Sequence, residues 1–289
     1  MIKLIASDMD GTLLNSELQI SQENIDAIRY AESTGVEFVI ATGRGRTEAI
    51  PALEEAGITC PMITLNGALV FDKTGTPVFS APIDSSLIET VFDILDEEDI
   101  YYEIATENGI YTAKKEQRIE NFSAVLAEMM PHLTRKMAIA MAMARLEFFT
   151  ITTVDNLKTF VNDNRVSVLK IIAFHKKGPL HLSVAAKRLH EFEDLVITSS
   201  GANNIEINHK NAQKGIAVAR LAQQRQVDLE EVMTIGDNLN DMSMIQVAGV
   251  SFAMGNAAPE IKEHAKYLTV INVESGVGKA IRRAVDEEL

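Results

Sequence analysis

Short apolar runs alternate with longer amphipathic segments over the first 80 residues of the chain. The apolar runs have the length of buried strands, and the segments between them repeat apolar residues at helical spacing. Ser21 suits the N-cap of the first amphipathic segment, and Gly35 suits its C-terminal stop. The expected strands are 2–6, 36–41 and 62–65, and the expected helices are 21–35 and 47–56. Strand–helix–strand units of this length predict parallel strands joined by right-handed crossovers.

The same alternation returns at the end of the chain, whereas the middle differs. The expected elements of the tail are a helix at 215–225, a strand at 232–235, a helix at 241–247, a strand at 250–253 and a helix near 277–288. Residues 83–192 have longer helical segments and less regular strands. We therefore predict a Rossmann-like α/β core with a parallel sheet, formed by residues 1–82 and 193–289, with an α+β domain inserted at 83–192.

Length and composition agree with a folded protein of two domains. The chain has 289 residues, of which 46% are hydrophobic and 24% charged, and this composition excludes wholesale disorder. Its single cysteine, Cys60, excludes an intrachain disulfide and a multi-cysteine zinc site and fits a reducing cytoplasm. The longest apolar run, at 137–144, is far shorter than the ~20 residues needed to span a bilayer. We expect a cytoplasmic protein with no membrane partner.

The net charge of −14 narrows the choice of partners. A diffuse negative field argues against non-specific binding to nucleic acid or to an anionic membrane. A small anionic substrate would still bind where cations or a metal ion gather locally. The sequence does not define an oligomeric state.

Two acidic clusters directly follow predicted strands. Asp8-Met9-Asp10-Gly11-Thr12 comes after the first strand, and Gly236-Asp237-Asn238-Leu239-Asn240-Asp241 comes after the strand at 232–235. Each cluster alone is compatible with a solvated acidic loop or with a turn that leads into a helix. Open α/β sheets, however, bind ligands at the carboxyl ends of their parallel strands. Together the clusters therefore form an all-oxygen set of the kind that Mg²⁺ prefers.

Two further motifs fit an anion. Thr42-Gly43-Arg44 ends the second strand, where a hydroxyl and backbone N–H groups suit a phosphate oxygen, although an ordinary strand-to-helix turn has the same composition. Lys214 opens an amphipathic helix, where a cation opposes the helix dipole. This unfavourable placement favours an anion-pairing role for Lys214, with a simple exposed lysine as the alternative.

In their order along the chain, these four motifs resemble those of the haloacid dehalogenase-like superfamily. The long insertion between the second and third motifs resembles the type IIB cap of the Cof-type sugar phosphatases. Leu65-Asn66-Gly67-Ala68 before the insertion and Met254-Gly255-Asn256-Ala257 after the fourth motif strengthen the resemblance. It spans essentially the whole chain, and it implies a phosphatase with a Rossmann-like core and a cap that covers the site and selects the substrate.

The resemblance also implies a role for each motif residue. Asp8 would be the nucleophile and Asp10 the general acid/base. Mg²⁺ would be held by the Asp8 carboxylate, the Asp10 backbone carbonyl, Asp237 and, directly or through water, Asp241. The phosphoryl group would be bound by Thr42, Lys214, the backbone N–H groups of Met9 and Gly43, and the Asn240 amide.

Elementary electrostatics agrees with these roles. A carboxylate that attacks a phosphate ester meets anion repulsion, which Mg²⁺ and Lys214 would offset. Asp8 has to be ionised to attack, whereas Asp10 has to hold a proton for the leaving alkoxide and then accept one from water. We expect the substrate to be a small phosphorylated metabolite, such as a sugar phosphate, that is hydrolysed through an aspartyl-phosphate intermediate.

Other activities share part of this pattern. A dehalogenase of the superfamily would lack the second aspartate of the first motif, and Asp10 is present. A phosphomutase shares all four motifs and differs in keeping water out after phosphorylation. A non-catalytic regulator that binds phosphorylated metabolites would leave the motifs idle, although clustered carboxylates without a use cost stability through mutual repulsion.

A second aspartate lies in a sequence that resembles a phosphorylation site. Asp72-Lys73-Thr74-Gly75-Thr76 matches the phosphorylation motif of the P-type ATPases, which use related chemistry. Such pumps need membrane spans, and this chain has no apolar run of that length. Apolar runs at 68–71 and 78–79 flank the motif, so we predict a hairpin turn here.

Overall fold

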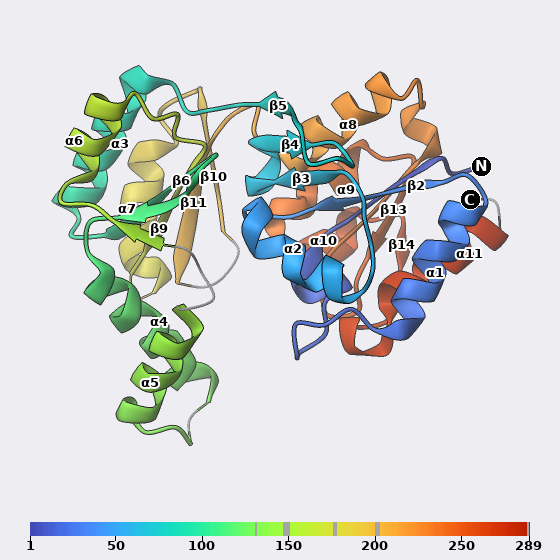
Figure 1. Ribbon diagram of the computed structural model, residues 1–289, viewed down its shortest axis with the longest axis horizontal. Helices are drawn as coiled ribbons and strands as arrows, with labels where there is room; N and C mark the ends of the chain where they lie inside the picture. The colour runs from blue at the N-terminus through green and yellow to red at the C-terminus, as the bar shows by residue number, and fades with distance from the viewer. Residues whose placement is uncertain (131, 147–150, 176–177, 200–202, 288) are drawn as a thin grey trace. The chain divides into compact units, whose positions relative to one another are not determined.

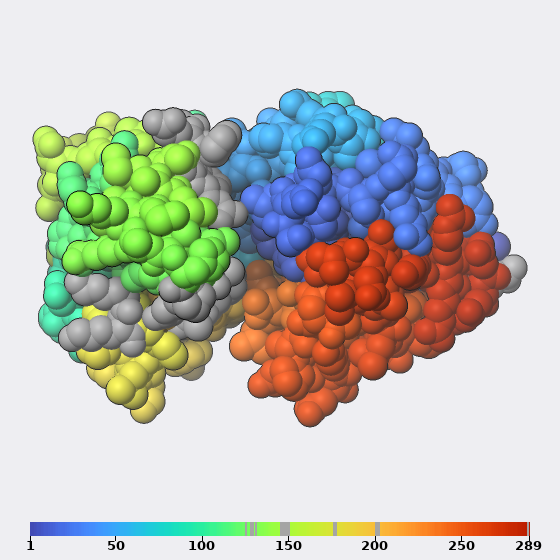
Figure 2. Space-filling model, turned by 90° about the horizontal axis from the view of Figure 1, so that it is seen from below, coloured from blue at the N-terminus to red at the C-terminus, as the bar shows by residue number. Residues whose placement is uncertain are grey.

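The chain forms two compact units. The computed structural model describes residues 1–130, 132–146, 151–175, 178–199, 203–287 and 289. The core unit consists of Met1–Ala81 and Asn211–Leu289, and the inserted unit consists of Pro82–Lys210 (Figure 1). The two ends of the chain meet in the core unit, where the blue N-terminal and the red C-terminal segments lie side by side (Figure 2).

The core unit is built on an eight-stranded sheet. Its strands are β1 (Leu4–Ser7), β2 (Glu37–Ala41), β3 (Met62–Thr64), β4 (Leu69–Phe71), β5 (Pro77–Ser80), β12 (Val232–Gly236), β13 (Val250–Ala253) and β14 (Tyr267–Leu268). Their order is β14-β13-β12-β1-β2-β3-β4-β5. The strands from β14 to β3 run parallel, and β4 and β5 are antiparallel additions at one edge. The parallel arrangement confirms the predicted fold class, and it brings the carboxyl ends of β1, β2 and β12 to one edge of the sheet.

Helices cover both faces of this sheet. They are α1 (Gln22–Ser33), α2 (Arg46–Glu55), α8 (Lys214–Gln224), α9 (Met242–Val247), α10 (Pro259–His264) and α11 (Gly276–Asp286). Alternate strand residues such as Leu4 and Ala6 are buried against α8 and α9, because successive side chains of a strand point to opposite faces. The predicted N-cap of α1 is confirmed, since the Ser21 hydroxyl accepts a hydrogen bond from the Asn24 N–H.

The inserted unit is an α+β domain with its own apolar core. Its sheet has the order β10-β11-β9-β6-β7-β8. The strands are β6 (Tyr101–Thr106), β7 (Gly109–Thr112), β8 (Ile151–Thr153), β9 (Lys170–Phe174), β10 (Leu195–Thr198) and β11 (Asn204–His209). The helices are α3 (Ser85–Glu97), α4 (Lys115–Met129), α5 (Arg135–Leu146), α6 (Leu157–Asn164) and α7 (Pro179–Leu189). Residues of α3, α6 and α7 are buried against one face of the sheet, which leaves α4 and α5 as a separate helical hairpin (Figure 1).

The inserted unit is longer than the sequence predicts. It runs from Pro82 to Lys210, whereas the expected segment was 83–192. The difference arises from β10 and β11, because β11 pairs with β9 and β10 pairs with β11. A short strand with alternating apolar residues fits either sheet equally well, so its membership depends on a distant partner such as Ile171, which lies opposite Ile207.

Three smaller expectations concern Asp72, Cys60 and the membrane. Residues 72–75 form the turn of the antiparallel β4–β5 hairpin, which confirms the turn prediction, and Gly75 adopts a φ of +85° there. Cys60 is buried in the core unit. Across the described parts of the chain, every helix is too short or too polar to cross a bilayer.

Candidate active site

The acidic clusters meet because their strands are neighbours. β1 and β12 pair in parallel with Ser7 opposite Ile235, so the residues that follow them emerge at the same edge. The Asp8 N–H continues the pairing by donating to the Ile235 carbonyl at 3.0 Å. Asp8 and Asp237 therefore begin adjacent loops, as the pattern of apolar runs followed by acids predicts.

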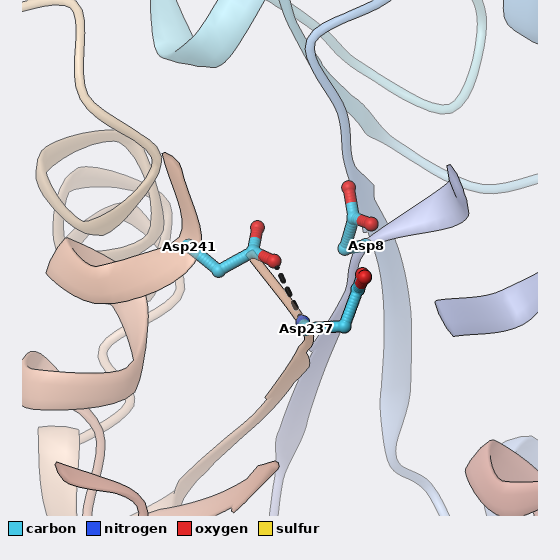
Figure 3. A group of neighbouring side chains, drawn as sticks. All are labelled: Asp8, Asp237 and Asp241. Carbon is cyan, nitrogen blue, oxygen red and sulfur yellow. Dashed lines mark hydrogen bonds between the residues drawn. The ribbon is translucent and has the colours of Figure 1, made fainter. Parts of the chain in front are cut away.

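Three carboxylates converge at this edge. One oxygen each of Asp8, Asp237 and Asp241 can be chosen so that all three lie within 4.8 Å of one another. Figure 3 shows the Asp8 side chain, which follows β1, beside the side chains of Asp237 and Asp241, which follow the neighbouring strand β12. The side chains of Asp8 and Asp241 are almost completely buried, and Asp237 is half-buried. The structure thus brings together three of the four residues that we expected to hold a metal ion.

Lys214 binds two of these carboxylates. Its Nζ donates to Oδ1 of Asp8 and to Oδ1 of Asp241, each at 2.6 Å. The whole Lys214 side chain is buried at the first residue of α8, so the alternative of an exposed lysine is wrong. A buried ammonium between two carboxylates is stabilised by charge-assisted hydrogen bonds that offset its loss of hydration.

Further hydrogen bonds orient the carboxylates of Asp241 and Asp237. The second oxygen of Asp241 accepts the backbone N–H groups of Asp237 at 2.9 Å and of Asn238 at 3.0 Å. Oδ1 of Asp237 accepts the Thr12 hydroxyl at 2.7 Å. A Cβ on Gly11 would lie 2.4 Å from Oδ2 of Asp237, so only glycine allows the first loop to approach so closely. These contacts fix the positions of the carboxylates of Asp237 and Asp241.

The cluster carries more negative than positive charge. Burial raises the pKa of Asp8 well above its ordinary value, and the charge of Asp241 raises it further although Lys214 lowers it. Burial and Asp241 also raise the pKa of Asp237 to about 6, against the hydrogen bond from Thr12. Burial disfavours the charged form of Lys214, but Asp241 and Asp8 outweigh it and raise the pKa of Lys214 above its ordinary value. The single ammonium of Lys214 therefore does not neutralise the charge of all three carboxylates.

A divalent cation fits this set of donors. The three side chains offer only carboxylate oxygens, which are the ligands of hard cations such as Mg²⁺. Burial is the main cause of the raised pKa of Asp8 and Asp237, and a cation would offset the carboxylate repulsion that adds to it. Asp8, Asp237 and Asp241 are therefore the residues that could hold a metal ion.

Asp10 takes a different position from Asp8. Its carboxylate is half-exposed and binds the guanidinium of Arg44 through two hydrogen bonds, from Nε at 2.7 Å and from a terminal nitrogen at 2.5 Å. The two aspartates of the first motif thus contact different partners. Asp8 contacts the buried Lys214, and Asp10 contacts Arg44. This separation suits two chemical roles for the pair.

The expected phosphoryl-binding residues surround the end of the sheet. Thr42 follows β2, and its hydroxyl accepts the Arg44 N–H at 3.1 Å. Asn240 lies in the short 3-10 helix Leu239–Asp241 that follows β12, and its amide donates to Oδ1 of Asn66 at 3.2 Å. Met9 is buried and Gly43 half-buried within the loops that follow β1 and β2. Lys214, the remaining expected phosphoryl-binding residue, directly contacts the carboxylate cluster through Asp8 and Asp241.

The sequence does not reveal several contacts of this site. The pairs Thr12–Asp237, Arg44–Asp10 and Asn66–Asn240 join residues that are far apart in the chain. Thr12, Arg44 and Asn66 each lie within a noted motif, which is the signal that could have marked them. Nothing in the linear pattern, however, indicates which partner each side chain chooses.

Comparisons with known proteins agree with this geometry. A family model described as haloacid dehalogenase-like hydrolase matches residues 5–281. The chain is 35% identical over 288 residues to the Bacillus subtilis protein named phosphatase YwpJ, with 97% of this chain and 99% of that protein covered. It is 33% identical over 284 residues to the 5-amino-6-(5-phospho-D-ribitylamino)uracil phosphatase YcsE of Bacillus subtilis, with 98% and 96% covered.

Solved structures give the same answer. A haloacid dehalogenase-like hydrolase from Bacillus subtilis matches the fold with a TM-score of 0.86 at 33% identity, covering 97% of this chain and 99% of that one. The family match spans both units, so the resemblance seen in the four motifs extends to the inserted unit. The chain therefore belongs to the haloacid dehalogenase-like hydrolases, and its enzymatic activity is that of a phosphatase.

Proposed function

We propose that the protein hydrolyses small phosphate monoesters in a Mg²⁺-dependent reaction, with Asp8 as the nucleophile. The observation that carries this proposal is the position of the Asp8 carboxylate. It lies at the end of β1, 2.6 Å from the buried Nζ of Lys214 and within a cluster of three carboxylates. A nucleophilic carboxylate beside a fixed cation suits attack on an anionic phosphoryl group.

In this proposal Asp8, Asp237 and Asp241 hold Mg²⁺, together with the Asp10 backbone carbonyl. Bound there, the ion would supply Lewis-acid stabilisation of the negative charge on the phosphoryl oxygens. Lys214 keeps the buried oxygen of Asp8 oriented, and its positive charge favours the ionised form of that carboxylate. The backbone N–H groups of Asp237 and Asn238 prevent Asp241 from turning away.

The reaction proceeds in two steps. An oxygen of Asp8 forms a bond to phosphorus while the bond from phosphorus to the leaving oxygen breaks, and Asp10 donates its proton to that oxygen. Water then attacks the aspartyl-phosphate, Asp10 accepts a proton from it, and phosphate leaves with Asp8 restored. For this role Asp10 has to exchange its contact with Arg44 for one with the leaving group.

Thr42, Lys214, Asn240 and the N–H groups of Met9 and Gly43 bind the phosphoryl oxygens in this proposal. Their placement supports it: they lie in the segments that follow β1, β2 and β12 and at the first residue of α8, where backbone and side-chain donors suit an anion. The inserted unit would select the leaving group as a cap. A relative that acts, by its name, on a phosphorylated ribityl compound supports small phosphorylated metabolites, such as sugar phosphates, as the substrate class.

The test is hydrolysis of 4-nitrophenyl phosphate with and without Mg²⁺, followed by a panel of phosphorylated sugars, nucleotides and cofactors ranked by kcat/KM. The proposal predicts Mg²⁺-dependent release of phosphate, and a preference for one class of metabolite over the others. Transfer of the phosphoryl group to a second sugar position without release would identify a phosphomutase. Tight binding of phosphorylated metabolites without turnover would identify a regulator.

A cytoplasmic location is part of the proposal. The single cysteine is buried, and burial raises its pKa to about 12, so the thiol is suited neither to disulfide formation nor to reactivity at neutral pH. Fractionation of the native host into cytoplasm and membrane tests the location.

A further inference from the structure

Three consecutive residues after β3 adopt left-handed backbone conformations. Leu65, Asn66 and Gly67 have φ values of +50°, +59° and +98°. This conformation is easy for glycine, tolerated by asparagine and disfavoured for a branched apolar residue such as leucine. The turn belongs to the Leu65-Asn66-Gly67-Ala68 motif, which the proposed reaction has left without a role. A strained turn that persists next to a candidate site is held there by the structure around it.

The turn is attached to the loop that contains Thr42. The Asn66 N–H donates to the Thr42 carbonyl at 3.0 Å, and the Leu65 N–H donates to the Arg44 carbonyl at 3.0 Å. These two bonds bracket Gly43, whose N–H is one of the proposed phosphoryl donors. The left-handed turn therefore sets where the Thr42–Arg44 loop lies.

The same turn contacts the fourth motif through a side chain. Oδ1 of Asn66 accepts the Asn240 amide at 3.2 Å, and the Asn66 side chain is buried with a 3% exposed fraction. Because an asparagine amide has two N–H groups, one held by Asn66 leaves the other for a phosphoryl oxygen. The acceptor on Asn66 also decides which side of the Asn240 amide presents nitrogen rather than oxygen.

The turn also packs against the start of α8, which contains Lys214. A Cβ on Gly67 would lie 2.5 Å from the carbonyl oxygen of Gln213, the residue before Lys214. That carbonyl accepts the N–H of Ala217 in the first turn of the helix. A side chain at position 67 would therefore collide with the backbone at the start of α8, so only glycine fits there.

We propose that Asn66 is a positioning residue for the phosphoryl group, which it serves by orienting the Asn240 amide and by fixing the Thr42 loop. One short turn then links three separate segments that carry phosphoryl donors. The inference rests on the proposed function, because it requires that Asn240 binds the phosphoryl group. It extends that function to a residue whose amide side chain accepts a hydrogen bond from Asn240.

Glycine is the informative replacement for Asn66. It adopts a φ of +59° without strain, so Asn66→Gly removes the acceptor for Asn240 and keeps the backbone of the turn. Gln226→Gly is the matched control, because Gln226 is an exposed non-glycine residue of the same unit with a φ of +57°. A double-mutant cycle with Asn240→Ala shows whether Asn66 acts through Asn240.

The cycle is measured with 4-nitrophenyl phosphate as substrate and inorganic phosphate as inhibitor, alongside the melting temperature of each variant. We expect Asn66→Gly to lower kcat/KM by about 10- to 100-fold and to raise the inhibition constant of phosphate, since misplaced donors bind the phosphoryl group less well. In the Asn240→Ala background the same change should have little further effect. Gln226→Gly should retain wild-type kinetics.

Two results would overturn this inference and leave the proposed function intact. One is an active wild-type enzyme whose Asn66→Gly variant has wild-type kinetics. The other is a set of losses that multiply in the double variant, which would show that Asn66 does not act through Asn240. A wild-type enzyme without phosphatase activity would instead overturn the proposed function and this inference with it. Should Asn66→Gly fail to fold, Asn66→Ala removes the same acceptor, and the same outcomes decide.

Discussion

Two loops of the core unit contain an aspartate followed by a glycine and a threonine, and they have opposite environments. Asp8 follows a parallel strand, is buried, and contacts Lys214 in a cluster of carboxylates. Asp72 lies in the turn of an antiparallel hairpin, where its Oδ1 accepts the N–H groups of Thr74 and Thr76 at 2.9 Å. The first aspartate is surrounded by groups from distant segments, whereas the second bonds only its own turn in the described hydrogen bonds.

The pKa shifts of the two aspartates follow from this difference. Burial and the charge of Asp241 raise the pKa of Asp8. The Thr74 hydroxyl and the Thr76 N–H lower the pKa of Asp72 below its ordinary value. A carboxylate satisfied by its own turn is stable and unreactive, whereas one held among like charges is poised to bind a cation or an electrophile. A local sequence match therefore says less about chemistry than the strand end on which it falls.

The largest expected effect separates the two aspartates directly. Asp8→Asn removes the proposed nucleophile and should lower kcat for 4-nitrophenyl phosphate by roughly four orders of magnitude. Asp72→Asn should leave kcat within about twofold, because surface changes away from the site rarely matter. Steady-state kinetics on both purified variants checks this, and an inactive Asp72→Asn enzyme would show that the wrong aspartate was chosen.

The metal requirement is expected to follow the Asp8 cluster only. EDTA should abolish activity and Mg²⁺ should restore it, with Ca²⁺ a poor substitute because it prefers more ligands and looser geometry. Asp237→Ala removes one ligand and should raise the half-saturating Mg²⁺ concentration by about tenfold or more. Asp72→Ala is the matched control and should leave that concentration unchanged. Full activity in chelator would contradict the proposed mechanism.

Each aspartate has a lysine that can be compared in the same way. Lys214→Met removes the ammonium that contacts Asp8 and should lower kcat/KM by about 100-fold or more for every phosphate ester alike. Lys73→Met changes the exposed neighbour of Asp72 and should have no measurable effect. Melting temperatures are needed beside the rates, because Lys214→Met leaves buried carboxylates without their cation. A loss of kcat/KM confined to a few substrates would instead indicate that Lys214 contacts the leaving group.

The smallest effect concerns the stability of the hairpin. Because the folded-state pKa of Asp72 lies below its ordinary value of 3.8, its ionised form stabilises the fold above that value. This stabilisation is lost as the pH falls through the folded-state pKa. Asp72→Asn should therefore be slightly less stable than the wild type in urea unfolding at pH 7, and the difference should shrink toward pH 3. A difference that grows on acidification would contradict the hydrogen bonding of this turn.

The sequence predicted most elements of the core unit because their signals are local. The runs that became β1, β2 and β12 are short and apolar, and each is followed by Asp, Thr or Gly where the strand ends. The Asp72 turn was predictable for the same reason, since a glycine at a positive φ between apolar runs determines it.

Features that depend on distant residues were not predictable in the same way. The end of the inserted unit was placed too early, because strand β11 joins β9 only through pairings such as Ile207 with Ile171. Arg44 was noted as part of a motif, but its two bonds to Asp10 depend on the folded position of the first loop. The contact between Asn66 and Asn240 likewise joins distant parts of the chain, so it could be seen only in the folded structure.

The central claim is that the phosphoryl group is transferred to Asp8. The direct measurement mixes the enzyme with saturating 4-nitrophenyl phosphate and Mg²⁺, quenches it during turnover, and reduces it with sodium borohydride before peptide sequencing by mass spectrometry. Borohydride converts an aspartyl-phosphate to homoserine, so the modified position marks the nucleophile. We predict homoserine at position 8, and none there without substrate. Homoserine at position 72, at position 10 or at any other aspartate, with Asp8 unchanged, would contradict the account.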